Sequence, residues 1–295
     1  MADSPLFGRV ALLGIGLIGS SLARVLRRDR LARRIVAVAR TAATRDTALR
    51  LGIADEVTAD APAAVAGADL VVLAVPMGAY RAIAEAIGPA LAPGAIVTDV
   101  GSVKRSALAD VAPHLPAHVH FVPGHPIAGT EYSGPEAGFD TLFEGRWCIL
   151  TPPPGTDPRA VERVAELWRR AGSMIEVMDA EHHDKVMAIT SHLPHVIAYT
   201  IVGTVVDLEQ ATQREVVKFA ASGFRDFTRI AASDPIMWRD VFLYNRDAVL
   251  EMLQRFNEDL TRLQRAIRRG EADTLEDWFT RTREIRRGII DAGQA

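Results

Sequence analysis

Short, almost continuous apolar runs recur through the first half of the chain, separated by polar and amphipathic segments. Runs of this kind are typical of strands in a parallel sheet that is covered on both faces. The expected strands are Val10–Leu13, Arg34–Ala39, Ala68–Pro76, Ala95–Val100, His120–Val122, Arg146–Leu150 and Met174–Met178. An amphipathic helix, Arg159–Ala171, separates the last two. This alternation predicts an α/β fold with a doubly wound, mainly parallel sheet that ends near Asp179.

No strand pattern recurs after Asp179, and long segments with helical periodicity follow. The expected helices are Ala180–Val206, Glu209–Ala220, Pro235–Arg269 and Glu271–Ile290, with a break at Gly270. We therefore predict two domains, a sheet domain over residues 1–179 and an all-helical C-terminal domain over residues 180–295.

Apolar residues in one of these helices are spaced alternately by four and three positions, as in a helix that packs along one face. They are Val249, Leu253, Phe256, Leu260, Leu263 and Ile267. Burial within one subunit would also explain this seam. Because a helical domain appended to such a sheet often associates with a second copy, we expect a homodimer formed through the helical domain.

The most specific motif of the sheet domain is the G-x-G-x-x-G stretch Gly14–Gly19, which follows the first strand and opens a helix. In this context Gly14 permits a tight turn, Gly16 lets the backbone approach a pyrophosphate, and Gly19 allows close packing of helix on strand. The helix N-terminus, beginning with Leu17 and Ile18, then faces the phosphates. These features predict a Rossmann-type domain that binds a nicotinamide dinucleotide at these residues.

The residue at the end of the second strand bears on the choice between NAD and NADP. An acidic residue there binds the ribose 2′-hydroxyl, whereas a basic residue accommodates a 2′-phosphate. This chain has Arg40 at that position, followed by Thr41. Arg40 favours NADP, although stacking on adenine, exposure to solvent and a contact from Asp46 are alternatives.

Ligands of such sheets bind at the carboxyl ends of the strands. We therefore expect Val75, Pro76 and Ser102 beside the cofactor or the substrate. Ser102 is also a candidate cap for a helix that starts near Val103. Lys104 either reaches the site or extends into solvent.

His125 stands between Gly124 and Pro126. Because proline disfavours the helical region for the residue before it, we expect a loop to present this histidine. Loops on a rigid scaffold often carry catalytic groups, and the ordinary pKa of histidine, about 6.5, suits proton transfer near neutrality. His125 is therefore a candidate base, the alternative being a surface histidine in a turn.

Composition restricts the class of protein. The chain has 295 residues, is 48% hydrophobic and carries a net charge of −3, so no charge excess favours nucleic acid. The single cysteine, Cys148, forms no intrachain disulfide and lies in an apolar run that predicts a buried strand. The apolar start, Val10–Leu17, has no basic flank and is broken by glycine, so we expect no signal peptide, no membrane span and a cytoplasmic protein.

Two polar segments, Ser191–His195 and Ser222–Ile230, interrupt the helical half, the first at a predicted break at Pro194. Such segments can converge on a cleft between domains. His183, His192 and His195 raise the possibility of a metal site, but their spacing is not characteristic of one and we predict none.

Several motifs in order resemble the prephenate/arogenate (cyclohexadienyl) dehydrogenase family of tyrosine biosynthesis over nearly the whole chain. The similar segments are Gly14–Gly19, Asp99–Lys104, Gly124–Gly129, Ser191–His195, Asp226–Ile230 and Asp234–Arg239. The resemblance implies oxidative decarboxylation: hydride leaves the ring carbon that bears the hydroxyl for the nicotinamide, a base takes the hydroxyl proton, and carbon dioxide departs.

The resemblance also implies roles for single residues. His125 corresponds to the catalytic histidine, and Ser102 to a serine that helps hold the hydroxyl and the histidine. Arg229 corresponds to the arginine that binds a substrate carboxylate, for which a bidentate guanidinium is suited, and Arg225 is the nearby substitute. His195 corresponds to a contact of the substrate side chain.

Trp238 corresponds to a tryptophan near the site, although a place in the core explains it equally well. The chain resembles the stand-alone form, without a fused mutase or regulatory domain. The sequence leaves prephenate and arogenate open as substrates.

Two other functions remain alternatives. A dehydrogenase of the hydroxyisobutyrate or phosphogluconate type would use a lysine at the helical cleft, for which Lys185 and Lys218 are candidates, but it would leave His125 unexplained. A redox sensor that binds the dinucleotide without turnover would need no base at His125.

Overall fold

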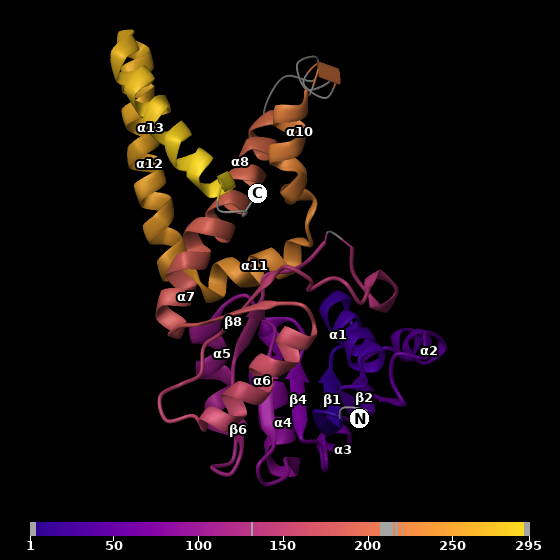
Figure 1. The fold of residues 1–295 in the computed structure, drawn as a ribbon. Helices are drawn as coiled ribbons and strands as arrows, with labels where there is room; N and C mark the ends of the chain where they lie inside the picture. Colours follow the sequence, from indigo (N-terminus) through magenta and orange to yellow (C-terminus); the bar gives the residue numbers. More distant parts are fainter. Residues whose placement is uncertain (1–3, 131, 207–214, 216–217, 220, 292–295) are drawn as a thin grey trace. The chain divides into compact units, whose positions relative to one another are not determined.

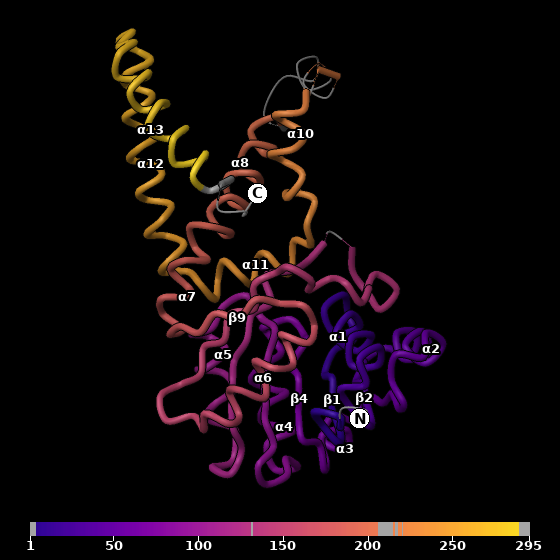
Figure 2. The backbone as a smooth tube through the Cα atoms, in the orientation of Figure 1, coloured from indigo at the N-terminus to yellow at the C-terminus, as the bar shows by residue number. Residues whose placement is uncertain are grey.

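The computed structural model describes residues 4–130, 132–206, 215, 218–219 and 221–291. The chain divides into two compact units, Met1–Arg246 and Asp247–Ala295. The domain boundary expected at residue 179 stays a prediction. In Figures 1 and 2, the strands and the helices that pack on them are coloured indigo to magenta, and the helices of the C-terminal part of the chain orange to yellow.

The first unit is built on a six-stranded parallel sheet with the strand order β3-β2-β1-β4-β5-β6. Its strands are β1 (Phe7–Leu13), β2 (Ala32–Val38), β3 (Glu56–Thr58), β4 (Leu70–Leu73), β5 (Ile96–Asp99) and β6 (His120–Phe121). The strand order reverses between β1 and β4, which is the switch point where ligands bind in this class of sheet. The predicted α/β class is confirmed, and within this six-stranded sheet the short strand β3 is the one that had no counterpart in the sequence pattern.

Helices cover both faces of this sheet. They are α1 (Leu17–Arg28), α2 (Ala42–Arg50), α3 (Ala61–Val65), α4 (Tyr80–Ile87), α5 (Lys104–Val111) and α6 (Pro158–Arg170). The alternation of side chains along β1 shows why. Val10 and Leu12 pack in one core with residues of α1 and α6, whereas Ala11 and Leu13 pack in a second core with residues of α4 and α5. Short 3₁₀ turns join these elements: η1 (Met77–Ala79), η2 (Gly88–Ala90), η3 (Ala112–His114) and η4 (Pro135–Ala137).

A separate three-stranded sheet follows, with the order β7-β8-β9. It contains β7 (Gly124–Pro126), β8 (Trp147–Leu150) and β9 (Met174–Val177). The prediction that a loop presents His125 is wrong, because β7 pairs antiparallel with β8 and places His125 opposite Ile149. A proline is compatible with this position because β7 is an edge strand. As expected, Cys148 lies buried in the middle strand.

The helical part of the first unit comprises α7 (Ala180–Met187), the π-helical turn η5 (Ala188–His192), α8 (Leu193–Val206), α10 (Ser222–Thr228), the 3₁₀ turn η6 (Arg229–Ala232) and α11 (Pro235–Tyr244). The expected break at Pro194 is wrong, since the π-helical turn carries the chain from α7 into α8 without interruption. Such turns accommodate a local misfit in helical hydrogen bonding and are frequent at functional sites. The predicted helix Glu209–Ala220 lies mostly outside the described residues.

The continuous helix Ala180–Val205 is long and apolar enough to cross a membrane, judged by length and composition alone. Its first half nevertheless carries three buried polar side chains, His183, Asp184 and His192, which form hydrogen bonds to other elements of the unit. These contacts indicate a helix of the folded unit.

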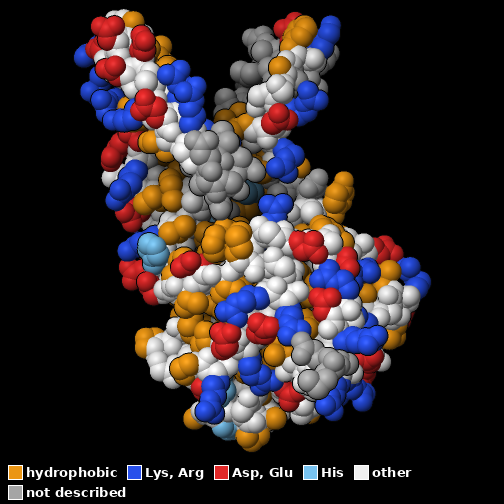
Figure 3. Space-filling view, in the orientation of Figure 1, with side chains coloured by type: hydrophobic (Ala, Val, Ile, Leu, Met, Phe, Trp, Pro, Cys, Tyr) orange, Lys and Arg blue, Asp and Glu red, His pale blue; other side chains and the backbone are white. Residues whose placement is uncertain are grey.

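The predicted helix Pro235–Arg269 is divided at Asn245 into α11 and α12 (Arg246–Arg269), and α13 (Ala272–Asp291) follows Gly270. The apolar seam lies along α12. Val249 is buried, whereas Leu260 and Ile267 are 51% and 66% exposed. The seam is therefore only partly covered within the described part of one chain. On the face of the molecule drawn in Figure 3, basic and acidic side chains are interspersed.

Candidate active site

The glycine motif has the geometry that a bound dinucleotide requires. Gly14 has a φ of +102°, and a Cβ there would lie 2.2 Å from the carbonyl oxygen of Ala74. A Cβ at Gly19 would lie 2.2 Å from the carbonyl oxygen of Gly14, so α1 approaches the end of β1 closely. A Cβ at Gly16, in contrast, would meet nothing within 4 Å. Gly16 thus leaves open space at the N-terminus of α1, where a pyrophosphate would be accepted.

The other expected cofactor residues surround this edge of the sheet. Leu17 and Ile18 form the first turn of α1, which has no side-chain cap. Arg40 is exposed just after β2, and Val75 and Pro76 lie in the turn that follows β4. The structure thus gathers these residues at the carboxyl ends of β1, β2 and β4, and their contacts with a cofactor stay a prediction.

His125 is the inner end of a chain of hydrogen bonds. It is 8% exposed, and its Nδ1 lies 2.9 Å from Nε2 of His183. Nδ1 of His183 lies 2.8 Å from the carboxylate of Asp184, and both of these residues are buried. Burial lowers the pKa of His183 and holds the pKa of His125 well below its ordinary value, so both rings are neutral near neutral pH.

These partners determine where the protons lie. A carboxylate only accepts hydrogen bonds, so His183 carries its proton on Nδ1 and accepts at Nε2. His125 must then donate from Nδ1, which leaves the lone pair of its Nε2 free. Among the described residues, Nε2 of His125 has no hydrogen-bond partner.

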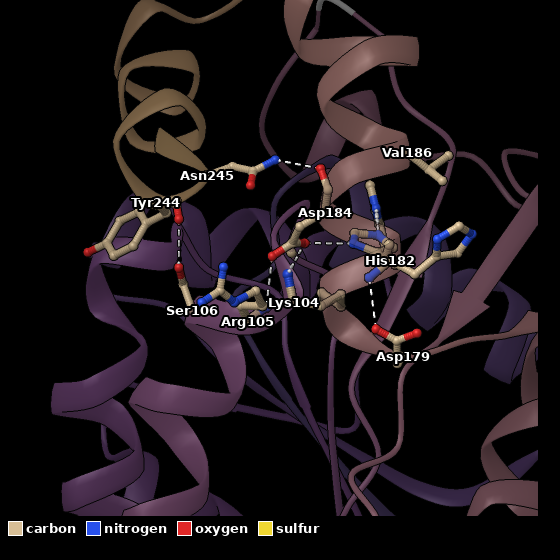
Figure 4. Close-up of polar contacts among 12 residues, drawn as sticks. Lys104, Arg105, Ser106, Asp179, His182, Asp184, Val186, Tyr244 and Asn245 are labelled. Atoms are coloured by element: carbon tan, nitrogen blue, oxygen red, sulfur yellow. Dashed lines mark hydrogen bonds and ion pairs between the residues drawn. The ribbon is translucent and has the colours of Figure 1, made fainter. Parts of the chain in front are cut away.

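Asp184 also holds the start of α5. Its carboxylate accepts hydrogen bonds from the backbone N–H groups of Lys104, at 2.8 Å, and of Arg105, at 3.0 Å (Figure 4). The expectation that Ser102 caps this helix is wrong, because a carboxylate from another helix satisfies the first N–H groups and no side chain of α5 itself does so. Ser102 lies half-buried in the turn between β5 and α5.

A buried ion pair fixes the strand that carries His125. The ammonium group of Lys104 lies 2.5 Å from the carboxylate of Asp99 and 2.7 Å from the carbonyl oxygen of Gly124. The same carboxylate accepts the N–H of Gly124 at 3.2 Å and the hydroxyl of Tyr80 at 3.0 Å. Lys104 is fully buried, so the alternative that it extends into solvent is wrong. Burial lowers its pKa, and the charge of Asp99 opposes that effect.

Asn245 connects the break between α11 and α12 to this network. Its side-chain amide donates to the carbonyl oxygen of Asp184, at 2.9 Å, and to Nδ1 of His192, at 3.0 Å. His192 therefore carries its proton on Nε2, a buried nitrogen without a partner in the described part of the chain. Burial lowers its pKa to about 4. Such an orphaned buried donor is typical of a place where a ligand or an ordered water binds.

His195 and Trp238 form a stacked pair. Their ring centroids are 3.5 Å apart and the rings are inclined by 21°. Nδ1 of His195 donates to the carbonyl oxygen of Ser191 at 2.9 Å, which leaves Nε2 as an acceptor. Burial lowers the pKa of His195, and the nearby positive charge of Arg229 lowers it further. Trp238 is 7% exposed and packs in the second core, as the core alternative expected, whereas its place near a bound substrate stays a prediction.

Two models of known families match the chain. One is described as the nucleotide-binding domain of prephenate dehydrogenase and matches residues 22–177; the other is described as its dimerization domain and matches residues 179–281. The chain belongs to the prephenate dehydrogenase family.

Individual members of this family are similar over almost the full length. The cyclohexadienyl dehydrogenase of Zymomonas mobilis is 42% identical over 95% of both chains, and the prephenate dehydrogenase of Bacillus subtilis is 32% identical over 95% of this chain and 76% of its own length. The crystal structure of Aquifex aeolicus prephenate dehydrogenase with hydroxyphenyl propionate and NAD⁺ is 36% identical, with a TM-score of 0.89, and covers 96% of this chain and 98% of that one. Synechocystis arogenate dehydrogenase is 29% identical, with a TM-score of 0.80 over 94% and 98% of the two chains.

These comparisons confirm the resemblance and a nicotinamide dinucleotide as cofactor of this family member. A 3-hydroxyisobutyrate dehydrogenase that is 13% identical shares only the fold, with a TM-score of 0.57. Of the two lysines expected in such an enzyme, Lys185 is exposed on α7 and pairs with Glu181 at 2.7 Å, and Lys218 lies over the ring of Phe219.

Three residues of this network were not predicted from the sequence: His183 as a hydrogen-bonding residue, Asp184 and Asn245. His183 was a candidate only as a metal ligand. Both ring nitrogens of His183 are engaged in hydrogen bonds, and the described residues contain no group of three or more potential ligands placed to hold a metal. The sequence did hold one signal of this network: His183 and Asp184 lie on the buried face of α7, beside the apolar residues Ala180 and Met187.

Proposed function

We propose that this chain catalyses the NAD(P)-dependent oxidative decarboxylation of prephenate to 4-hydroxyphenylpyruvate, of arogenate to tyrosine, or of both. The observation that carries this proposal is the Nε2 lone pair of His125, which has no partner among the described residues and belongs to a buried ring at the end of a hydrogen-bond chain. A neutral imidazole so placed is a general base for a hydroxyl proton.

The residues of this chain have separate roles in the proposed reaction. Nε2 of His125 takes the proton of the ring hydroxyl as its O–H electrons form the carbonyl bond, and Ser102 holds that hydroxyl. The guanidinium of Arg229 binds a substrate carboxylate, and His195, supported by the ring of Trp238, contacts the substrate side chain. A nicotinamide dinucleotide bound at the Gly14–Gly19 turn supplies the hydride acceptor. Loss of carbon dioxide then leaves an aromatic ring.

The test is an assay at the absorbance of the reduced nicotinamide that crosses prephenate and arogenate with NAD and NADP, with the aromatic product identified by mass. Reduction that depends on one ring substrate, with equimolar carbon dioxide, supports the proposal. If no pair of substrate and cofactor gives reduction, the proposal fails. Oxidation without carbon dioxide release would instead favour a hydroxyacid dehydrogenase, and cofactor binding without turnover a redox sensor.

We propose further that NADP is accepted, with Arg40 binding the 2′-phosphate. Arg40 is exposed at the end of β2, whereas the guanidinium of Arg45 folds back onto the carbonyl oxygens of Ala39 and Arg40, at 3.0 and 2.9 Å. Arg40→Asp should therefore lower kcat/KM for NADP relative to NAD by about tenfold or more. Arg45→Gln is the matched control, and an unchanged cofactor ratio in Arg40→Asp contradicts the assignment.

We propose that two copies of the chain associate through the helical half, as the description of the second family model suggests. The partly uncovered seam on α12 supports this. Sedimentation should give twice the mass of one chain, and Leu260→Lys with Ile267→Lys should shift the protein toward monomer. A monomeric wild-type protein would contradict this assembly.

A further inference from the structure

The hydrogen-bond chain behind His125 extends to two residues that do not meet the substrate. We propose that His183 and Asp184 are positioning residues, which fix the tautomer of His125 and stabilise the positive charge that it acquires. This inference rests on the proposed function, because it concerns the step in which His125 takes the proton.

The first observation is that the chain of contacts has only one consistent arrangement of protons. Asp184 accepts from Nδ1 of His183 at 2.8 Å, and Nε2 of His183 accepts from Nδ1 of His125 at 2.9 Å. The opposite arrangement would place a proton on Nε2 of His125 and remove the lone pair that the reaction needs. Asp184 therefore determines, through His183, which nitrogen of His125 is basic.

The second observation is that the outer end of the chain is rigid. The two N–H groups at the start of α5 hold the carboxylate of Asp184, and the amide of Asn245 holds its backbone carbonyl at 2.9 Å. Figure 4 shows this carboxylate between Lys104 of α5 and Asn245. The N-terminus of α5 also favours a negative charge at this point. A rigid carboxylate that serves only to cap a helix would need no histidine as a further partner.

The third observation concerns the charge that the reaction creates. When the substrate O–H bond breaks and the Nε2–H bond of His125 forms, the ring becomes a cation and its Nδ1–H donates a charge-assisted hydrogen bond to His183. His183 is in turn polarised by Asp184. No further proton leaves the site, so the balance of the step is complete. The interaction is stronger after proton transfer than before it, which is the condition for accelerating the reaction.

The surroundings contain few other charges. Among the described residues, the other titratable groups that act on the two histidines are Asp99 of β5, Lys104 of α5 and His192 of η5. The thiol of Cys148 of β8 lies beside the backbone of His125. Lys104 is paired with Asp99, although its positive charge still lowers the pKa of both histidines. Burial raises the pKa of the Cys148 thiol so that it stays uncharged. Burial keeps His192 neutral as well. Asp184 is therefore the group that compensates a positive charge on His125.

The experiment measures kcat, KM and the pH dependence of kcat/KM in three variants of the full chain. His183→Phe keeps a ring but removes the acceptor. His183→Gln retains an amide oxygen that can accept from His125, and it guards against a loss of fold. His182→Gln is the matched control, because His182 is the exposed neighbour on the same helix. Cofactor affinity measured by fluorescence confirms that each variant is folded.

We expect His183→Phe to lower kcat about 100-fold with cofactor affinity unchanged. The acidic limb of its pH profile should move to lower pH, because protonated His125 has lost its acceptor. His183→Gln should recover about tenfold of this loss, and His182→Gln should match the wild type. The proposal is overturned if His183→Phe keeps its kcat within about threefold, or if kcat falls while the acidic limb stays in place. If the wild type itself turns over neither ring substrate, the proposed function fails instead.

Discussion

The buried pair of Lys104 and Asp99 supports a quantitative prediction for Lys104→Met. Both side chains are fully buried, and methionine has a similar length without the charge. Removing one partner of a buried ion pair costs about 3–5 kcal/mol, because the other charge stays behind without compensation. Asp99 keeps three donors, the hydroxyl of Tyr80 at 3.0 Å and the N–H groups of Gly101 at 2.9 Å and Gly124 at 3.2 Å. We therefore expect the lower end of this range, about 3 kcal/mol of unfolding free energy.

The assay is urea-induced unfolding followed by tryptophan fluorescence, for which the fully buried Trp168 provides a signal. The double variant Asp99→Asn with Lys104→Met removes both charges and should be more stable than the sum of the two single changes predicts, by about 2 kcal/mol. Turnover offers a second readout. Lys104 also holds the carbonyl of Gly124 next to His125, so Lys104→Met should lower kcat. A stability of Lys104→Met within about 0.5 kcal/mol of wild type, or strict additivity in the double variant, would show that the charge of Asp99 does not depend on Lys104.

Three further predictions follow from other parts of the site. The pKa of His192 is about 4 in the folded chain and 6.5 ordinarily, so between these pH values the unfolded chain binds a proton that the folded chain does not. The unfolding free energy should therefore fall by about 2 kcal/mol between pH 7 and pH 5, and urea unfolding of His192→Asn at a series of pH values should lack this decrease. The added Cβ of Gly16→Ala would meet no atom of the protein within 4 Å, so the melting temperature of this variant should equal that of wild type. KM for the cofactor should rise about tenfold, because the methyl group obstructs the pyrophosphate, and an unchanged KM would argue against a pyrophosphate at this turn. Arg229→Lys should raise KM for the ring substrate about tenfold with little change in kcat, because lysine cannot form the bidentate contact, and steady-state kinetics that show an unchanged KM would transfer the role to Arg225.

The sequence predicted the parts of this fold that depend on local pattern. The strands β1, β2, β4 and β5 are near-continuous apolar runs, and the turn at Gly14 needs a positive φ that glycine supplies without strain. Strand β7 was missed because three residues with a proline carry no strand signal of their own. It forms only because β8, more than twenty residues later, provides its hydrogen-bond partners.

The same distinction applies to the site. His125 was identified because it stands in a recognisable local context, whereas its partner His183 lies 58 positions away in the chain. Asp184 replaces Ser102 as the cap of α5 across a comparable gap, and Asn245 divides a helix whose apolar periodicity runs on without a break. Tertiary hydrogen bonds between distant elements decide all three cases, and a single sequence carries no record of which distant groups meet.

In the proposed mechanism, His125 is the base of this dehydrogenase. The most direct test is the kcat of His125→Asn beside the wild type, with the ring substrate and the cofactor that the wild type uses, together with the dissociation constant of that cofactor. We expect kcat to fall about 1000-fold, since asparagine cannot take the proton, while the cofactor binds as tightly as before. A variant that keeps its kcat within about threefold of wild type would show that His125 is not the base.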